Sequence, residues 1–196
     1  MSHLDGIRLV LASASPRRLE LLRQIGIEPL VEPAHVDETV PEGTSPEEAV
    51  VALAESKARE VVAHHRGEDL VVLGADTLVV VDGTALGKPE DDAAAAEMLS
   101  RLSGRTHQVV TGVAVIAAAT GETRSGRATT EVRMRPLSDG EIAAYVASGE
   151  PHDKAGAYAI QGRAAVFVEG IVGDHSNVVG LPLPLLDRLL ADLRAH

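Results

Sequence analysis

Cysteine and tryptophan are absent from the 196-residue chain, and its only aromatic residues are one Phe and two Tyr. Without cysteine there is no disulfide framework, thiol nucleophile or cysteine-based zinc site. With so few aromatic rings, the bases of a single-stranded nucleic acid would find few platforms on which to stack. The core must therefore consist of Ala, Val, Leu and Ile, and single-stranded nucleic acid is a poor candidate partner.

Positive charge is also scarce, since 18 Lys and Arg face 29 Asp and Glu and give a formal net charge of −11. Such a surface would repel a nucleic-acid duplex. No apolar run approaches the roughly 20 residues needed to cross a bilayer, and residues 1–13 lack the pattern of a signal peptide. We expect a cytoplasmic protein without a nucleic-acid or membrane partner, whose anionic ligand is small and meets a local cluster of cations.

The pattern of apolar residues indicates an α/β fold with a mixed sheet, because strands and helices are mixed without strict alternation. The length and a hydrophobic content of 45% favour one domain over residues 1–196, with two lobes around a cleft as the economical arrangement. Strands are predicted at residues 7–12, 30–31, 70–73, 78–81, 109–117, 129–134 and 166–172. Helices are predicted at residues 16–25, 46–64, 89–102, 139–147 and 185–193.

A candidate anion site lies where the first strand gives way to the first helix. Ser13, Ser15, Arg17 and Arg18 cluster at this junction. Backbone N–H groups and the helix dipole favour an anion there, and guanidinium groups bind phosphate with two parallel hydrogen bonds. The alternative is an ordinary helix cap followed by two solvated arginines.

Asp76 is a carboxylate set between the apolar runs 70–73 and 78–81. A partly buried carboxylate needs a cation, a hydrogen-bond donor or a proton, and either a divalent metal or a lysine would satisfy it. The alternative is a turn between two strands, with Gly74 supplying the bend. Ionisable groups within apolar stretches cluster at functional sites, which favours the first interpretation.

Lys57 interrupts an apolar helix face formed by residues 50, 53, 54, 58 and 61. An ammonium group in such a face either extends to solvent or finds a negative partner. Asp76, Glu38 and a substrate phosphate are the candidate partners.

Weaker signals surround these residues. Lys88 precedes a predicted helix and so lies near another anion-favouring N-terminus, while Glu38 is either a metal ligand or loop charge. Thr77 and Gln161 could bind the edge of a base. No histidine pair has the spacing of a zinc protease, and the phosphate-binding motifs of P-loop and Rossmann proteins are missing.

Nine short stretches occur in order along the chain: residues 11–18 (LASASPRR), 36–38 (VDE), 57–58 (KA), 73–77 (LGADT), 87–89 (GKP), 102–107 (LSGRTH), 110–112 (VTG), 153–162 (DKAGAYAIQG) and 177–182 (NVVGLP). In these stretches and in their order, the chain resembles the Maf family over nearly its full length. The resemblance implies a nucleotide pyrophosphatase with an elongated mixed sheet flanked by helices, two lobes around a central cleft, and a homodimer. Residues 153–162 are similar to the branch that acts on dTTP and UTP.

In that branch, the positions matching Arg17, Thr77 and Gln161 determine substrate choice, and the position matching Asp76 accepts a proton. Two residues depart from the family's pattern and could alter loop shape near the base. Ala164 stands where a glycine is usual, and Asp174 stands where a serine is common.

The implied reaction is hydrolysis at the α-phosphorus with release of pyrophosphate, which requires positioning and charge neutralisation. Magnesium is the expected metal because carboxylate and phosphate oxygens are its usual ligands, with Mn²⁺ or Co²⁺ as alternatives. Asp76 serves either as the base or as a metal ligand. The expected site comprises Asp76, Lys57 and Lys88 as catalytic residues, Ser13, Ser15, Arg17, Arg18, Thr77 and Gln161 as substrate-binding residues, and Glu38 and Asp76 as metal ligands. The alternatives are a pyrophosphatase for other or modified nucleotides such as 7-methyl-GTP, and a nucleotide-binding regulator of cell division.

Overall fold

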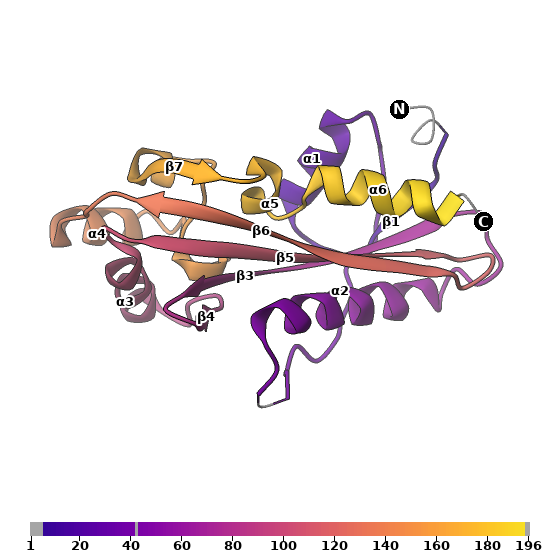
Figure 1. Ribbon diagram of the computed structural model, residues 1–196, viewed down its shortest axis with the longest axis horizontal. Coiled ribbons are helices and arrows are strands. Elements are labelled where there is room, and N and C mark those ends of the chain that lie inside the picture. The colour runs from indigo at the N-terminus through magenta and orange to yellow at the C-terminus, as the bar shows by residue number, and fades with distance from the viewer. Residues whose placement is uncertain (1–5, 42, 195–196) are drawn as a thin grey trace. The chain divides into compact units, whose positions relative to one another are not determined.

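A computed structural model of the chain describes residues 6–41 and 43–194 (Figure 1). The strands are β1 (Leu9–Leu11), β2 (Leu30–Val31), β3 (Val71–Val81), β4 (Thr84–Leu86), β5 (Thr106–Ala117), β6 (Thr123–Met134) and β7 (Val168–Val172). The α-helices are α1 (Pro16–Gln24), α2 (Pro46–Val62), α3 (Asp92–Leu102), α4 (Asp139–Val146), α5 (His175–Val179) and α6 (Leu183–Arg194). Two short 3-10 helices are η1 (Ala155–Ala157) and η2 (Arg163–Phe167).

Within the described residues, the strands form one seven-stranded sheet in the order β2-β1-β3-β5-β6-β7, with β4 paired to β3. Strand β1 pairs in parallel with β2 and with β3, so that Leu11 lies opposite Val31 and Leu73. The pairs β3–β4 and β6–β7 are antiparallel. The predicted α/β class and mixed sheet are therefore confirmed.

The chain divides into two compact units. The first unit contains the described residues up to Asp76, together with Thr111–Ala128 and the described residues from Gly180 onwards. The second unit contains Thr77–Val110 and Thr129–Val179. Strands β3, β5 and β6 each contribute residues to both units.

In the first unit, helix α2 packs directly on the sheet. Its N-terminus is fixed by a capping box in which Ser45 and Glu48 bond each other's backbone N–H groups, and Pro46 occupies the first helical turn. A buried stripe that includes Ala54 and Ala58 then faces β1, β3 and β5. In Figure 1 the purple helix α2 lies on one side of these strands and the yellow helix α6 on the other.

Two glycines permit the close approach of α2. A Cβ atom at Gly74 of β3 would lie 2.1 Å from the carbonyl oxygen of Ala54, and one at Gly112 of β5 would lie 2.2 Å from that of Val50. No side chain fits at either position unless the helix moves away from the sheet. Gly74 is thus the contact point between strand and helix and supplies no bend.

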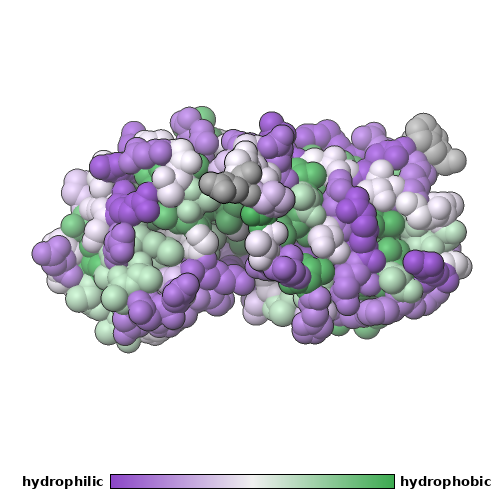
Figure 2. Space-filling model, turned by 90° about the horizontal axis from the view of Figure 1, so that it is seen from below, coloured by the Kyte–Doolittle hydropathy of each residue, from purple (hydrophilic) through white to green (hydrophobic). Residues whose placement is uncertain are grey.

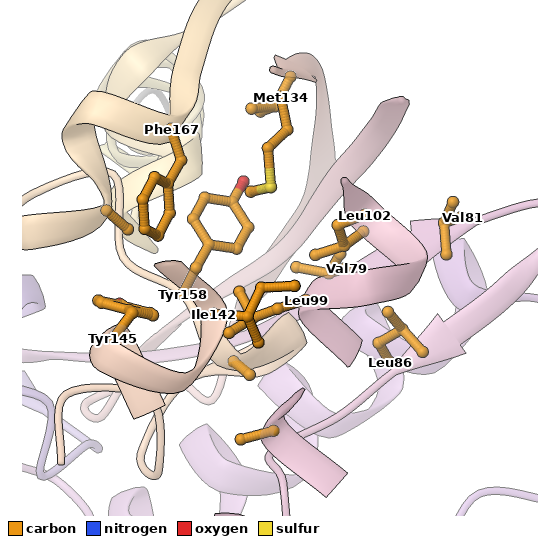
Figure 3. Packing of buried hydrophobic residues seen from close by; sticks show 14 of the residues in the cluster. Val79, Val81, Leu86, Leu99, Leu102, Met134, Ile142, Tyr145, Tyr158 and Phe167 are labelled. Carbon is orange, nitrogen blue, oxygen red and sulfur yellow. The ribbon is translucent and has the colours of Figure 1, made fainter. Parts of the chain in front are cut away.

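The second unit has its own apolar core, part of which is drawn in Figure 3. Leu99 and Leu102 of α3 and Ile142 of α4 are buried in it. The ring of Tyr145 meets that of Phe167 edge to face, with centroids 5.3 Å apart and planes at 82°. The chain's few aromatic residues are thus concentrated here, where such ring pairs add to the stabilisation from buried area.

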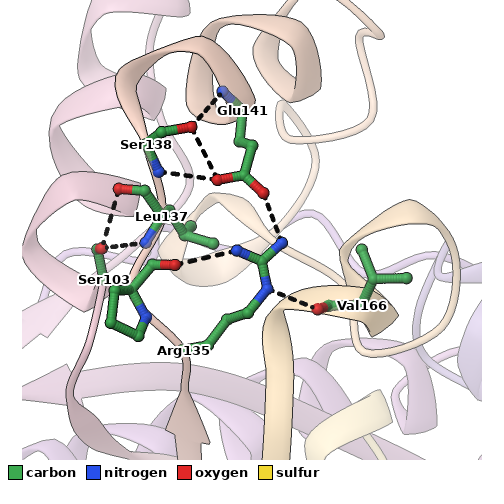
Figure 4. Close-up of polar contacts among 7 residues, drawn as sticks. Ser103, Arg135, Leu137, Ser138, Glu141 and Val166 are labelled. Carbon is green, nitrogen blue, oxygen red and sulfur yellow. Dashed lines mark hydrogen bonds and ion pairs between the residues drawn. The ribbon is translucent and has the colours of Figure 1, made fainter.

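Arg135, just after β6, joins three segments of the second unit (Figure 4). Its guanidinium donates to the Val166 carbonyl oxygen at 3.0 Å and to Glu141 Oε1 at 2.7 Å. Glu141 also forms the capping box of α4 with Ser138. The hydrogen bond from Arg135, followed by those from Ser138, lowers the pKa of Glu141 to about 2.

The fold departs from the sequence predictions at several boundaries. The runs 70–73 and 78–81 belong to one continuous strand, β3, rather than to two segments separated by a turn. Helix α3 begins at Asp92 instead of residue 89, because the side chain of Asp91 caps it by accepting a hydrogen bond from Ala94 N at 2.7 Å. Helix α5 was not predicted at all.

Hydrophilic and hydrophobic side chains are interspersed on the face shown in Figure 2. Among the described residues, no helix is both long enough and apolar enough to cross a bilayer.

Candidate active site

The junction of β1 and α1 gathers hydroxyl and guanidinium groups in the first unit. Ser13 Oγ accepts hydrogen bonds from Ser15 N at 3.2 Å and from Arg18 Nη1 at 3.0 Å. Ser15 is the N-cap residue of α1, as predicted, but its side chain makes no capping bond, and the first turn has no acidic residue. Arg17 lies in that turn, so the N-terminus of α1 combines the helix dipole with a nearby guanidinium.

Arg18 lies deeper than an ordinary solvated arginine. Its Nε donates to the carbonyl oxygen of Gly180 at 2.8 Å, which joins the stretches 11–18 and 177–182. Burial is the main cause that lowers the pKa of Arg18. The negative charge of Asp76 raises this pKa, the positive charge of Arg17 lowers it, and the negative charge of Glu38 raises it. The Arg18 guanidinium therefore lies within electrostatic range of both predicted carboxylates.

Lys57 binds both carboxylates that the sequence offered as partners. Its Nζ lies 2.6 Å from Asp76 Oδ1 and 2.6 Å from Glu38 Oε1. The Lys57 side chain is only 11% exposed, so the ammonium group does not extend to solvent. Asp76 lies in the interior of β3 and is buried, which rules out the alternative of a turn residue.

Local geometry explains why these side chains meet. Residues two apart on a strand face the same side of the sheet. A side chain at position 74 would point at Ala54 and Ala58 of α2. The side chain of Asp76, two residues further along the strand, therefore projects toward the same helix. Lys57 precedes Ala58 on α2, and its long side chain reaches the Asp76 carboxylate. The contact that requires glycine at position 74 thus also places Lys57 beside Asp76.

Two carboxylates of the site have the donor chemistry of a divalent-metal site. Asp76 and Glu38 offer hard oxygen donors around one point, the Nζ of Lys57. No group of three or more His, Asp or Glu side chains among the described residues could hold a metal by itself. Magnesium is usually bound through one or two carboxylates together with phosphate oxygens of a ligand, and the donor chemistry of Asp76 and Glu38 is compatible with such a site.

Three predicted site residues belong to the second unit. Thr77 follows Asp76 on β3, and Gln161 is exposed in the loop between η1 and η2. Lys88 is exposed and precedes α3, as expected, but the helix begins later than predicted. Helix α3 starts four residues later and is capped by the Asp91 carboxylate, so an acid occupies that helix end.

One backbone contact and one side-chain contact join the motifs of the second unit. Gly156 N donates to the Gly87 carbonyl oxygen at 3.0 Å, which brings residues 87–89 and 153–162 together. His107 Nε2 lies 2.8 Å from the Tyr158 hydroxyl oxygen and links residues 102–107 to the same stretch. Residues 153–162 are therefore held by two other motifs of the chain.

Tyr145 and Glu150 support the loop of Gln161, although neither is among the site residues that the sequence predicts. The Tyr145 hydroxyl donates to Glu150 Oε1 at 3.0 Å, and both oxygens of that carboxylate accept from Arg163 N at 3.2 Å. The available signal was the scarcity of aromatic residues, since Tyr145 is one of only two tyrosines.

The two departures from the family's pattern have defined environments. Ala164 is completely buried in η2. The Asp174 carboxylate accepts hydrogen bonds from Ser176 N at 2.8 Å and from Ser176 Oγ at 2.7 Å, at the start of α5. Local hydrogen bonds thus satisfy Oδ1 of Asp174, whereas its Oδ2 is buried without a hydrogen-bond partner among the described residues.

A helix N-terminus rich in arginine, next to a lysine between two carboxylates, suits a protein that binds and cleaves a phosphorylated small molecule. A family model described as Maf-like protein matches residues 8–193. The chain therefore belongs to the Maf family.

Curated relatives cover nearly the whole chain. The dTTP/UTP pyrophosphatase of Moorella thermoacetica is 55% identical over 184 residues, 94% of each chain. That of Symbiobacterium thermophilum is 55% identical over 176 residues, 90% of this chain and 89% of the relative. The nucleoside triphosphate pyrophosphatase of Streptomyces coelicolor is 50% identical over 186 residues, 95% of this chain and 90% of the relative.

The fold is also similar to a solved structure of low sequence identity. The structure of a HAM1 protein from Coxiella burnetii matches with a TM-score of 0.50 and 15% identity, covering 97% of this chain and 100% of that one. This likeness supports the α/β architecture alone.

Proposed function

We propose that this chain hydrolyses dTTP and UTP to the nucleoside monophosphate and pyrophosphate. The observation that carries the proposal is its 55% identity, over 94% of its length, to a relative named dTTP/UTP pyrophosphatase. The Lys57–Asp76–Glu38 cluster supports it, because a protein that only binds nucleotides has no need of carboxylates close to repelling phosphates.

The reaction adds water across one phosphoanhydride bond. The water oxygen bonds to the α-phosphorus, and the bond from that phosphorus to the bridging oxygen breaks. The electron pair leaves with pyrophosphate, and the proton of the water passes to a base. Asp76 is the proposed base because it is the buried carboxylate of the cluster.

The cations position the phosphates and offset their charge. Ser15 and Arg17 at the N-terminus of α1 bind phosphate oxygens through the helix N–H groups and the guanidinium. Lys57 neutralises two carboxylates that would otherwise repel a triphosphate. Asp76 and Glu38 would hold Mg²⁺, which when bound supplies positive charge to the phosphate oxygens. Lys88 is proposed to act on the departing pyrophosphate.

Base selection is assigned to the second unit. Uracil and thymine present the same edge, with acceptor oxygens on both sides of the N3–H donor, whereas cytosine carries an amino group at position 4. The Gln161 amide offers both a donor and an acceptor, and the Thr77 hydroxyl can do the same. These groups match an edge that dTTP and UTP share.

We also propose a homodimer, a cytoplasmic location and a role in removing unwanted nucleotides from the cellular pool. Molecular mass in solution measures the first of these directly. The remaining two require work in cells.

The proposed function is tested by pyrophosphate release from dTTP, UTP, CTP, GTP and 7-methyl-GTP, with Mg²⁺ and with a chelator. The expected result is metal-dependent release from dTTP and UTP well above the others. Pyrophosphate release mainly from a nucleotide with another base would support the proposed reaction but contradict the proposed preference for dTTP and UTP. Nucleotide binding without release from any of them would reject the enzyme and favour a regulatory binder.

A further inference from the structure

The loop that carries Gln161 is held on its C-terminal side by Glu150. Both carboxylate oxygens of Glu150 accept a hydrogen bond from Arg163 N, each at 3.2 Å. Gly162, whose φ is 113°, lies between Gln161 and Arg163 in the chain. A Cβ at Gly162 would lie 2.7 Å from Glu150 Oε1, so the loop backbone rests against this carboxylate.

The same loop is held on its N-terminal side by Tyr145 of α4. The Tyr145 hydroxyl accepts a hydrogen bond from Ala159 N at 3.4 Å and donates its own to Glu150 Oε1 at 3.0 Å. Its ring is fixed in the core against Phe167 (Figure 3). Burial, and then the hydrogen bond to Glu150, raise the pKa of Tyr145, so the hydroxyl keeps the proton that it donates.

Glu150 is itself fixed at its backbone. Its N–H donates to Ser148 Oγ at 3.3 Å, and its carbonyl oxygen accepts from Lys154 Nζ at 2.6 Å. Gln161 therefore lies between two anchored backbone positions, Ala159 and Arg163, while its own side chain is exposed.

From this arrangement we infer that Tyr145 and Glu150 are positioning residues that set how strictly the enzyme distinguishes uracil from cytosine, acting through Gln161. The inference rests on the proposed function and deepens it. Uracil and cytosine exchange donor and acceptor at positions 3 and 4 of the ring. An amide group on a fixed backbone can pair with the donor and acceptor pattern of one base, and it leaves polar groups unpaired when the other base is bound. An amide group on a mobile backbone can adjust to either base.

The test compares Glu150→Gln and Tyr145→Phe with the wild type and with Glu169→Gln. The last is a matched control in the same unit, because Glu169 is exposed and pairs only with the exposed Arg133 among the described contacts. For each folded protein, kcat and KM are measured with UTP and with CTP. We expect both loop variants to raise the KM for UTP about tenfold, the loss of one charge-assisted hydrogen bond, and to reduce the preference for UTP over CTP.

A second comparison shows whether the effect passes through Gln161. Gln161→Ala alone should also reduce the preference for UTP, and adding Glu150→Gln to it should reduce the preference no further. A merely structural role of Glu150 would lower the melting temperature and total activity without changing the ratio of kcat/KM for the two nucleotides. An unchanged ratio in folded Glu150→Gln, or an additive loss in the double variant, would overturn the inference.

Direct binding keeps this result separate from the proposed hydrolysis. The Kd values for UTP and CTP, measured by calorimetry with the wild type and Glu150→Gln, report the same discrimination without turnover. If the wild type hydrolyses neither nucleotide, the proposed function fails, and a Glu150-dependent preference in binding would still support the positioning role. Equal binding of both nucleotides by the wild type would reject the positioning role itself.

Discussion

Lys57 Nζ lies 2.6 Å from Asp76 Oδ1, and the two side chains are only 11% and 12% exposed. The same nitrogen lies 2.6 Å from Oε1 of Glu38, whose side chain is 54% exposed. The two carboxylates therefore differ, because Asp76 is largely removed from water and Glu38 is well solvated. Lys57 joins a buried acid to an accessible one.

This difference predicts an order of stabilities. Lys57→Met removes the ammonium group that lies between the two carboxylates and should lower the free energy of unfolding by about 3 kcal/mol. Asp76→Asn should cost less, because Glu38 still pairs with Lys57. Urea denaturation of both variants measures the order. An equal loss of unfolding free energy in the two variants would mean that the ion pair between Glu38 and Lys57 contributes nothing to stability.

Asp76→Asn should nevertheless remove most of the activity. The amide cannot accept the proton of the attacking water, and a general base contributes roughly 10²–10⁴-fold to a rate. Pyrophosphate release from UTP measures the loss, and circular dichroism shows whether the fold is retained. Turnover near the wild-type rate in a folded Asp76→Asn protein would contradict the role proposed for this carboxylate.

Gly74→Ala should destabilise the protein strongly. Its Cβ would lie 2.1 Å from the Ala54 carbonyl oxygen, and α2 would have to move off the sheet. We expect a loss of about 3 kcal/mol, the upper end of the usual cost of overpacking, because the clash is with backbone. Gly140→Ala is the control, since a Cβ there meets nothing within 4 Å and alanine favours the helix in which it lies. The melting temperatures of both variants are compared with that of the wild type. Equal melting temperatures for Gly74→Ala and Gly140→Ala would contradict the prediction.

Much of the first unit could be predicted from the sequence because its signals are local. Lys57 in an apolar helix face and Asp76 between apolar runs each indicated a buried charge in need of a partner. Glu38 and Asp76 were named as candidates for Lys57, and the structure brings all three together. The family resemblance then supplied the reaction and the substrate.

What the sequence could not provide depended on packing between distant segments. The bend assigned to Gly74 is instead the contact of a straight strand with α2, which only the tertiary structure shows. The helix predicted from residue 89 begins at Asp92, because Asp91 and not Pro89 marks its N-terminus. The roles of all predicted site residues, the metal ion, and the single domain over residues 1–196 remain predictions.

The buried His107 predicts that the protein loses stability in mild acid. Burial lowers the pKa of His107 to about 4, from an ordinary value of 6.5. Between these values the unfolded chain takes up a proton that the folded one does not, so stability falls as the pH drops from about 6.5 to 4. The contribution is up to about 3 kcal/mol. Urea denaturation of the wild type and His107→Gln at pH 7 and pH 4.5 should show a smaller pH effect in the variant, and an equal one would contradict the prediction.

His65 predicts the opposite dependence on pH. Its Nε2 lies 2.8 Å from Glu32 Oε2 and its Nδ1 lies 3.0 Å from Glu68 Oε1, so each ring nitrogen faces a carboxylate oxygen. Both nitrogens can donate only when the ring is protonated, and the bonds to Glu32 and then Glu68 raise the pKa of His65 above 6.5. The folded state thus holds a proton that the unfolded chain releases first, and this stabilisation is complete below pH 6.5 and disappears as the pH rises through the raised value.

The matching variant is His65→Gln, which keeps a polar side chain but cannot carry the charge. At pH 6 the wild type should melt higher than this variant by roughly 2 °C, the scale of a surface ion pair in a protein of this size. At pH 9 the difference should shrink, because the wild-type ring is then neutral. Melting curves of the two proteins at both pH values decide the matter. A gap that stays constant or widens with pH would show that the contacts of His65 do not depend on its charge.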